Sequence, residues 1–407
     1  MQSLTKQIDR VVPDITALRH ELHAHPELSY QEVETSRRVH ERLRAIAGLH
    51  IRANLAGGTG IVATLNAGKA GPCVALRADM DALPIQEETG RPYASQSPGK
   101  MHACGHDGHT ACLVGAAGVL STIAESLPGP VKFIFQPAEE GGAGGERMCR
   151  EGALDDPKVG AIFALHGWPS LPLGRIGIRS GAVLASTNPW SLTVHGSGAH
   201  AAYPHKGIDP IVVACQIVLG WQTVVSRFTA PVDACVVTVG KFHAGTAENI
   251  IPPVAELGGT IRTLNPETRE RAVRLVRQIA EQTAAAFGAR AELEIRDGYP
   301  VLMNDASAAA LVEQTGRALL GEAAVETGEP PSLGGEDFAY YAQRVPAAFW
   351  RLGVRDPAVA EMPGLHHPRY DFNDAALPIG IAMHCAVVQE FFARGGRLPA
   401  GPAAARG

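Results

Sequence analysis

The sequence predicts an α/β protein in which a smaller domain is inserted into a larger one, and three observations lead to this fold class. The chain has 407 residues, more than a single hydrophobic core usually supports. Its first part alternates short apolar runs with helical patterns, which is typical of a mainly parallel sheet. Its middle part has the order strand–helix–strand–strand–helix–strand, the ferredoxin-like βαββαβ arrangement. We therefore expect a larger domain at 1–185 and 297–407 and an inserted domain at 186–296.

In the larger domain, short runs rich in Val, Ile, Leu or Phe predict the strands Gly60–Asn66, Cys73–Ala78, Val131–Gln136, Ala161–Leu165 and, later in the chain, Ala347–Leu352. Apolar residues recur at helical spacing in three further segments, which predicts the helices Gly108–Leu127, Asp305–Leu320 and Asp374–Phe392. The low-complexity tail, Pro399–Gly407, is expected to fray.

In the inserted domain, the same reading gives six elements in chain order: Trp190–His195, Asp209–Arg227, Ala234–Phe242, Ala255–Leu264, Pro266–Phe287 and Arg290–Ile295. Pro266 followed by Glu267 is a good signal for the start of a helix. The most apolar stretch of the chain, Pro210–Val225, contains two glutamines and indicates a buried helix.

Composition and charge exclude several classes of protein. The formal net charge is −5 and no basic tract is present, so a nucleic-acid partner is not expected. We find no run of about 18 uncharged apolar residues and no apolar segment near the N-terminus, so a membrane span and a signal peptide are not expected. The seven cysteines are an odd number and are scattered, which favours free thiols in a reducing cytoplasm.

Several side chains of types that can bind metal ions follow predicted strands, at the point where each strand ends. Asp79 and Asp81 follow one strand, Glu139 and Glu140 follow another, and His166 closes a third. The carboxyl ends of parallel strands converge on the crevice where open α/β sheets bind ligands. We therefore expect these side chains to lie together, although a histidine at the end of an apolar strand is more often a satisfied core residue.

Cys104 and His106 flank a glycine in the segment before the predicted helix. A spacing of two aims both side chains at one point only in a loop, and Gly105 allows the necessary turn. Sulfur beside imidazole suits a borderline cation such as zinc. An isolated cysteine of this kind is usually a small buried apolar residue, but the neighbouring acids and histidines favour a metal site.

The pair Glu139-Glu140 offers two carboxylates with different directions. Such a pair is usually solvated surface, but here it follows an apolar strand. One carboxylate can hold a metal ion while its neighbour takes a proton from a bound water, and metal-dependent hydrolysis needs both functions.

Four segments carry a family resemblance: Met101–His109 (MHACGHDGH), Gln136–Glu140 (QPAEE), Leu165–Gly167 (LHG) and Leu365–Asp374 (LHHPRYDFND). They resemble the aminoacylase and carboxypeptidase family of metallopeptidases. Within it, the chain is similar to the branch of hippurate hydrolases, auxin-conjugate amidohydrolases and N-acetyl-diaminopimelate deacetylases. The resemblance covers nearly the whole chain, beginning at Leu22–Glu27 (LHAHPE).

The resemblance implies a metallopeptidase catalytic domain with an inserted lid and dimerisation domain, and a homodimer or dimer-based oligomer. It implies two divalent metal ions, either zinc, manganese, cobalt or nickel, with the ligands Cys104, His106, Glu140, His166 and His366. Cys104 corresponds to the bridging ligand, Glu139 to the catalytic acid/base and Asp81 to the carboxylate that orients the site. Asp79 is expected to support the site without binding metal. His367 is an alternative to the favoured His366.

In the inserted domain, the resemblance assigns roles to three residues. His200 corresponds to the residue that reaches across a dimer interface to polarise the scissile carbonyl group. Asn249 and Arg262 correspond to residues that grip the substrate, and a planar guanidinium suits the carboxylate of an acyl amino acid. Gly334–Phe338 resembles the family's glycine-rich loop beside the pocket. The remaining histidines singled out, among them His23, His102 and His109, are expected to be structural.

The predicted function is therefore metal-dependent hydrolysis of the amide bond of small N-acyl amino acids, such as hippurate-like, N-acetyl or indole-acetyl conjugates. One alternative is an amidase that uses Cys104 as a nucleophile activated by a nearby histidine. It predicts sensitivity to thiol alkylation and indifference to chelators. Another alternative is a zinc-stabilised binding module without turnover. Structural zinc sites often use paired cysteines, and those spacings are absent here.

Overall fold

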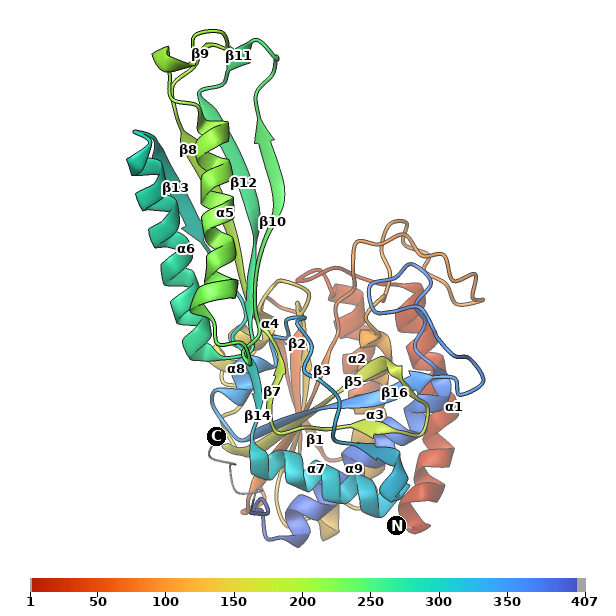
Figure 1. Cartoon of the computed structure of the whole chain (residues 1–407). Coiled ribbons are helices and arrows are strands. Elements are labelled where there is room, and N and C mark those ends of the chain that lie inside the picture. The colour runs from red at the N-terminus through yellow and green to blue at the C-terminus, as the bar shows by residue number, and fades with distance from the viewer. Residues whose placement is uncertain (1, 401–407) are drawn as a thin grey trace. The chain divides into compact units, whose positions relative to one another are not determined.

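The computed structural model describes the backbone of residues 2–400, so the predicted frayed tail lies largely outside the described residues. The chain divides into two compact units (Figure 1). Unit 1 comprises Met1–Gly181, Met303–Pro330 and Asp337–Gly407, and unit 2 comprises Ala182–Leu302 and Pro331–Glu336. The segment 186–296, predicted as an insertion, falls within unit 2. The chain passes between the units within β7 (Gly181–Leu184) and β14 (Leu302–Asn304), and again on either side of Pro331–Glu336.

Unit 1 is built on an eight-stranded sheet with the order β1-β2-β4-β3-β5-β16-β6-β15. Its strands are β1 (Leu49–Leu55), β2 (Gly60–Leu65), β3 (Cys73–Asp79), β4 (Val131–Gln136), β5 (Val159–Pro172), β6 (Ile176–Gly177), β15 (Val325–Glu326) and β16 (Ala347–Arg355). The central strands β4, β3, β5 and β16 are parallel. The pairs β1–β2, β2–β4 and β16–β6 are antiparallel, and β15 is parallel to β6. The prediction of a mainly parallel α/β sheet is confirmed.

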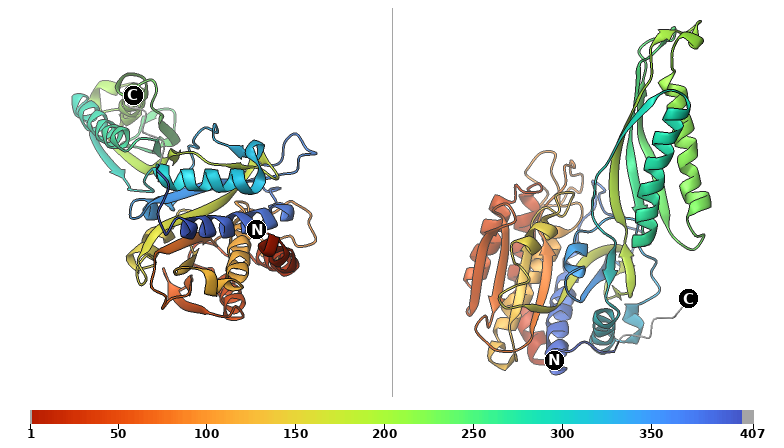
Figure 2. Two further views of the ribbon diagram at one scale, coloured as in Figure 1. Left: turned by 90° about the horizontal axis from the view of Figure 1, so that it is seen from below. Right: turned by 90° about the vertical axis from the view of Figure 1, so that its left-hand side faces the viewer.

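The large helices of unit 1 pack against one another and against this sheet, and they share its hydrophobic core. They are α1 (Gln2–Ala24), α2 (Val33–Arg44), α3 (His106–Ser121), α7 (Ala306–Leu320) and α9 (Leu377–Ala393). The first and last of these, red and blue in Figure 2, lie side by side. The short helices α4 (Gly144–Arg150) and α8 (Ala339–Ala342) pack against each other. Single 3₁₀ turns lie at Ala124–Ser126, Glu322–Ala324 and Asp374–Ala376.

Helix α3 begins two residues earlier than predicted and ends six residues earlier. Gly105 precedes it in a left-handed conformation (φ 87°), so the helix begins at His106. At its far end, α3 stops at Ser121 and a 3₁₀ turn replaces the predicted last turns. The early start matters because it places a predicted ligand, His106, in the first turn of a buried helix.

Unit 2 contains a four-stranded antiparallel sheet with the order β10-β12-β8-β13. The strands are β8 (Ser186–His195), β10 (Cys235–Ala244), β12 (Val254–Thr263) and β13 (Arg290–Ile295). Helices α5 (Pro210–Phe228) and α6 (Pro266–Ala286) share a hydrophobic core with it. The order along the chain is the predicted βαββαβ. Strands β9 (Ala199–His200) and β11 (Ile250–Ile251) pair near a 3₁₀ turn at Pro204–Lys206.

The prediction that the most apolar stretch, Pro210–Val225, is a buried helix is only partly right, because one face of α5 is exposed. Ile217, Trp221 and Val224 are buried in the core of unit 2, but Val212 and Leu219 are exposed. The helix therefore has two apolar faces, and residues 2–400, which the structure describes, cover only one of them. By length and composition alone, α5 and the stretch Asp374–Ala393 could each span a membrane, but core helices of soluble proteins pass the same test.

Candidate metal centre

The predicted ligands of unit 1 meet where β3 and β4 end and beside β5. His166 lies inside β5 (Val159–Pro172), so the prediction that it closes a strand is wrong, because the strand continues beyond the apolar run. β4, β3 and β5 are adjacent and parallel. The donor atoms of Cys104, His106 and His166 lie within 4.8 Å of one another, and so do those of Cys104, Glu140 and His366. The expectation that side chains at strand ends converge is therefore met by the geometry. Their action as metal ligands stays a prediction.

Hydrogen bonds fix both inner histidines with one nitrogen turned toward the centre. His166 Nδ1 lies 2.8 Å from the carbonyl oxygen of Gly167, and His106 Nδ1 lies 2.8 Å from that of Asp81. A carbonyl oxygen only accepts, so both Nδ1 atoms donate a proton, and Nε2 is the atom of each ring that can offer a lone pair once it is deprotonated. The Nε2 atom of His166 lies 3.5 Å from the sulfur of Cys104. This is the arrangement in which histidines bind metal ions.

The surroundings of the His106 Nε2 atom test whether a metal ion fits this site. It is buried and has no hydrogen-bond partner among the described residues. The nearest carboxylate oxygens, from Asp79 and Glu140, are each 3.9 Å away. A buried imidazole nitrogen without a partner is costly, and a cation held with the nearby sulfur and carboxylate would satisfy it. Mixed S, N and O donors fit a borderline divalent cation.

His366, rather than its neighbour His367, joins the cluster. His366 Nε2 lies 3.2 Å from Glu140 Oε1. Its backbone is left-handed (φ 64°), and its N–H donates to the carbonyl of Ala103, next to Cys104. The Nδ1 atom of His367 instead accepts from the amide of Arg369 within its own turn. The geometry therefore supports His366, and not His367, as the proposed ligand.

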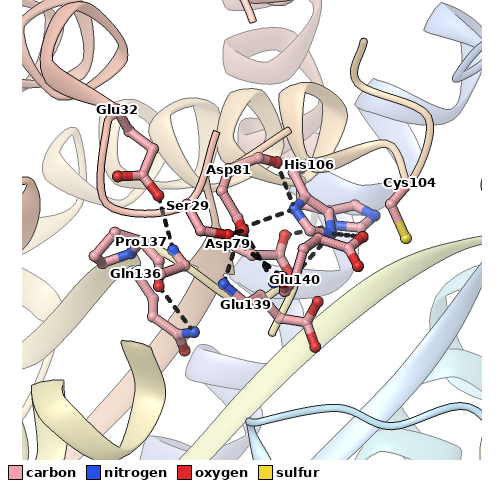
Figure 3. A network of polar contacts seen from close by, with 12 residues as sticks. Ser29, Glu32, Asp79, Asp81, Cys104, His106, Gln136, Pro137, Glu139 and Glu140 are labelled. Carbon is pink, nitrogen blue, oxygen red and sulfur yellow. Dashed lines mark hydrogen bonds and ion pairs between the residues drawn. The ribbon is translucent and has the colours of Figure 1, made fainter. Parts of the chain in front are cut away.

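Asp81 is the hub of the polar network in Figure 3. Its two carboxylate oxygens accept from the amides of Glu139 and Glu140, each at 2.9 Å. Ser29 Oγ donates to it at 2.7 Å, and His106 Nδ1 lies 3.3 Å away. Burial opposes the charge of Asp81, but these hydrogen bonds and the imidazole of His106 lower its pKa. Asp81 thus orients one ligand and the Glu139-Glu140 turn together, which supports the predicted role.

Asp79 and His109 form a second pair beside the ligands. His109 Nδ1 lies 2.7 Å from Asp79 Oδ1, and His109 Nε2 accepts from the amide of Gly167 at 2.8 Å. Arg77 donates to the other oxygen of Asp79 at 2.7 Å. Both nitrogens of His109 are therefore used, so it holds the backbone next to His166 instead of offering a lone pair. These contacts are consistent with the supporting role that the resemblance implies for Asp79, and that role stays a prediction.

Charges in the cluster favour cations. Burial raises the pKa of the Cys104 thiol well above its ordinary value, and the carboxylates of Glu140, Glu139 and Asp79 raise it further. Burial disfavours a charged His106, but Asp79, Asp81 and Glu140 outweigh it and raise the pKa of His106 to about 10. Without metal the site therefore holds protons, and metal ions can replace them.

Glu139 lies beside the ligands and is buried. Its Oε1 atom accepts from the amide of Asp337 at 3.4 Å. The Asp337 carboxylate is itself fixed by Arg77 at 2.9 Å, by Gln136, and by the amide of Gly145 at 2.7 Å. The last residues of the Gly334–Phe338 loop thus hold the predicted acid/base through their backbone.

Two of the three predicted residues of unit 2 lie together and the third lies apart. His200 is exposed on β9, and Asn249, also exposed, directly precedes β11, which pairs with β9 beyond the His195 end of the sheet. Arg262 is half-buried on β12, eight residues beyond Val254, the partner of His195. At up to about 3.4 Å per residue, Arg262 is on the order of 27 Å from that end. One small substrate cannot touch His200 and Arg262 of the same chain.

Several residues around the centre were missed by sequence reasoning. His109 was expected to be structural, although its position one helical turn after His106 is a signal that could have placed it here. Ser29, Glu32 and Asp337 also support the centre. They come from loops remote in sequence, and no local pattern distinguishes them from ordinary polar residues.

The chain is similar in sequence to a family of peptidases and to proteins named as a deacetylase and a hydrolase. The family described as Peptidase family M20/M25/M40 matches residues 75–390. An N-acetyl-L-cysteine deacetylase of Bacillus subtilis (strain 168) is 39% identical over 364 residues, which are 89% of this chain and 84% of that protein. The IAA-amino acid hydrolase ILR1-like 2 of Arabidopsis thaliana is 40% identical over 379 residues, 92% of this chain and 84% of that protein.

Among solved structures, the YXEP protein of Bacillus subtilis, described as a dinuclear metal binding peptidase from the M20 family, has a similar fold. It superposes with a TM-score of 0.80 at 35% identity, covering 93% of this chain and 98% of that chain.

Proposed function

Because this chain belongs to peptidase family M20/M25/M40, we propose that it is a metal-dependent amidohydrolase that splits N-acyl amino acids into a carboxylic acid and a free amino acid. The observation that carries the proposal is the convergence of sulfur, nitrogen and carboxylate donors beside a second buried carboxylate, Glu139. This is the division of labour that metal-dependent hydrolysis requires.

The proposed ligands of two divalent ions are Cys104, His106, Glu140, His166 and His366. Of the five proposed ligands, Cys104 is the one that shares a donor group with each of the other four, which supports it as the ligand common to both ions. The donor set is compatible with zinc, manganese, cobalt or nickel. When bound, the ions supply Lewis acidity, which polarises a carbonyl oxygen and makes water easier to deprotonate.

The protein side chains supply the proton transfers. Glu139 takes a proton from the attacking water and returns it to the departing amine. Asp81 keeps Glu139 and Glu140 in place through their amides. His200 donates to the developing oxyanion, an interaction worth about 3 kcal/mol when well placed. Arg262 holds the carboxylate end of the substrate. Asn249 lies beside His200, so we propose that it reaches the same substrate together with His200.

We propose a homodimer as the working form. The distance between His200 and Arg262 within one chain is too long for a small substrate to reach both, which supports a role for His200 at a site in a second subunit. The uncovered apolar face of α5, with Val212 and Leu219 exposed, gives unit 2 a surface that a second copy can bury.

The alternative of a Cys104 nucleophile is disfavoured by the electrostatics. A nucleophilic cysteine needs a lowered pKa, whereas burial and three carboxylates raise the pKa of Cys104. A non-catalytic zinc module would leave Glu139 without a role. All seven cysteines are free, and six are buried, in keeping with a proposed cytoplasmic location.

Removal and return of metal ions tests the proposal. Purified protein is dialysed against a chelator, metal content is measured by elemental analysis, and zinc, manganese, cobalt and nickel are added back singly. Activity is followed on hippurate, N-acetyl amino acids and indole-acetyl amino acids. We expect loss and recovery of turnover on at least one group. Activity that survives complete metal removal and is abolished by thiol alkylation would overturn the proposal in favour of the cysteine mechanism.

A further inference from the structure

The turn that carries Glu139 and Glu140 has an unfavourable backbone conformation. Ala138 has a φ of 55°, the left-handed region that residues with a Cβ rarely adopt. Ala138 is buried and lies directly before the proposed acid/base. Such a conformation persists only where surrounding contacts impose it, so the contacts of this turn decide where the two glutamates point.

Two buried carboxylates hold three successive amides of this turn (Figure 3). The amide of Ala138 donates to Glu32 Oε1 at 2.8 Å. The next two amides, of Glu139 and Glu140, donate to the two oxygens of Asp81, each at 2.9 Å. Successive amides that point to one side form a cradle for anionic oxygen, and here Asp81 and Glu32 share it.

The Glu32 side chain forms hydrogen bonds with this turn and does not cap its own helix. It stands directly before α2, yet its side chain makes no capping hydrogen bond there. Its other partners are the amide of Tyr30 at 3.0 Å and Thr59 Oγ1 at 3.0 Å. The carboxylate of Glu27 instead accepts from the amide of Thr35, in the first turn of α2, at 2.8 Å.

We propose that Glu32 is a positioning residue that imposes the left-handed conformation of Ala138 and thereby aims Glu139 and Glu140 in their different directions. This inference rests on the proposed function, because it assigns a role to Glu32 through those two glutamates. Burial and the charge of Asp81 raise the pKa of Glu32 to about 7, and its hydrogen bonds oppose that rise. The contacts of Glu32 occupy both its oxygens.

The experiment compares Glu32→Ala with the matched control Glu27→Ala, which also removes a carboxylate that binds backbone amides near α2. Both variants should lower the melting temperature. Only Glu32→Ala should lower kcat, by about 100-fold, with a smaller change in KM and with reduced metal content, because misaiming a reacting group by about 1 Å has effects of this size. Glu32→Gln, which keeps an acceptor oxygen for the Ala138 amide, should restore most of kcat.

A second substitution tests the conformational step directly. Glycine adopts the left-handed conformation without steric cost, so Glu32→Ala combined with Ala138→Gly should recover part of the lost kcat. Should Glu32→Ala fail to fold, Glu32→Asp withdraws the carboxylate by one methylene and should lower kcat about tenfold.

The outcome that overturns the inference is a Glu32→Ala enzyme, or the Glu32→Asp enzyme in its place, with the kcat and metal content of Glu27→Ala. A wild-type protein that turns over no N-acyl amino acid would instead contradict the proposed function. In that case the metal contents of the Glu32 and Glu27 variants still decide whether Glu32 positions the turn.

Discussion

At the scale of single residues, Glu139 is the side chain whose proposed role is most directly testable. Replacement by alanine removes the proton acceptor but leaves the proposed ligands in place. We expect Glu139→Ala to keep its bound metal and to lose about 100-fold to 10,000-fold in kcat. Steady-state kinetics and elemental analysis on the same sample provide the check. A variant with substantial activity would remove Glu139 from this role.

The charges of Cys104 and His106 predict that metal uptake depends on pH. In the metal-free protein the pKa of Cys104 is well above its ordinary value and that of His106 is about 10, so both carry protons at pH 7. Metal binding must displace these protons, and affinity should therefore fall as the pH falls. Titration calorimetry in two buffers of different ionisation enthalpy should report the release of about two protons. Equal heats in both buffers would contradict this prediction.

At the scale of the elements, the turn between Cys104 and His106 depends on a glycine. Gly105 has a φ of 87°, and a Cβ atom there would come within 2.9 Å of the hydroxyl of Tyr370. We expect Gly105→Ala to destabilise the protein by about 1–2 kcal/mol from the left-handed conformation alone. Metal affinity should fall with it, because the turn aims two of the ligands.

Gly118 on the same helix provides the control for this substitution. It lies inside α3, and a Cβ atom there has only Ile46 nearby, at 3.9 Å. Gly118→Ala should stabilise the helix by about 0.5–1 kcal/mol and leave metal binding unchanged. Denaturant unfolding and metal titration of both variants give the comparison. The prediction fails if Gly105→Ala binds metal as tightly as Gly118→Ala.

A buried ionic cluster joins α1 to the start of α3. His23 Nδ1 lies 2.8 Å from Asp107, the residue after His106, and His23 Nε2 lies 3.2 Å from Glu87. Burial lowers the pKa of His23, but Asp107 and Glu87 outweigh it and raise the pKa from 6.5 to about 9. Arg19 also donates to Asp107, at 2.8 Å.

This raised pKa makes stability depend on pH in a defined direction. The stabilisation from charged His23 is fully present below pH 6.5, and it is lost as the pH rises through about 9. The shift corresponds to about 3 kcal/mol as an upper bound. The melting temperature of the wild type should fall across this window more steeply than that of His23→Gln. Parallel curves would show that His23 is not charged in the folded protein.

At the scale of the whole molecule, the proposed dimer makes a prediction that no single chain can satisfy. If His200 acts on the partner's site, a mixture of Glu139→Ala and His200→Ala chains should regain activity after subunit exchange. Half of the dimers are then mixed, and each has one complete site, so about a quarter of the wild-type activity is expected. Enzyme assays after co-refolding give the measurement. Activity no higher than that of the separate variants would mean that His200 acts within its own chain or not at all.

Much of the larger fold follows from local patterns in the sequence. β4 and β13 have the predicted bounds because each is a short run closed by clear turn or helix signals. Helix α1 was not predicted, although Leu18 and Leu22 face the core at helical spacing, because its many polar residues hide that pattern. The uncovered face of α5 could not be seen either, since composition records how apolar a helix is and not which faces other elements cover.

The sequence by itself determined the α/β class, the βαββαβ order and the set of side chains expected at the metal centre, because periodicity and strand-end position are local properties. Only the tertiary structure decided which nitrogen of His106 and of His166 faces the centre. It alone also showed that His109 is hydrogen-bonded to Asp79 and that Glu32 accepts a hydrogen bond from the amide of Ala138. These depend on hydrogen bonds between segments far apart in the chain. Such contacts exist only after the sheet has brought the segments together, so no local pattern encodes them.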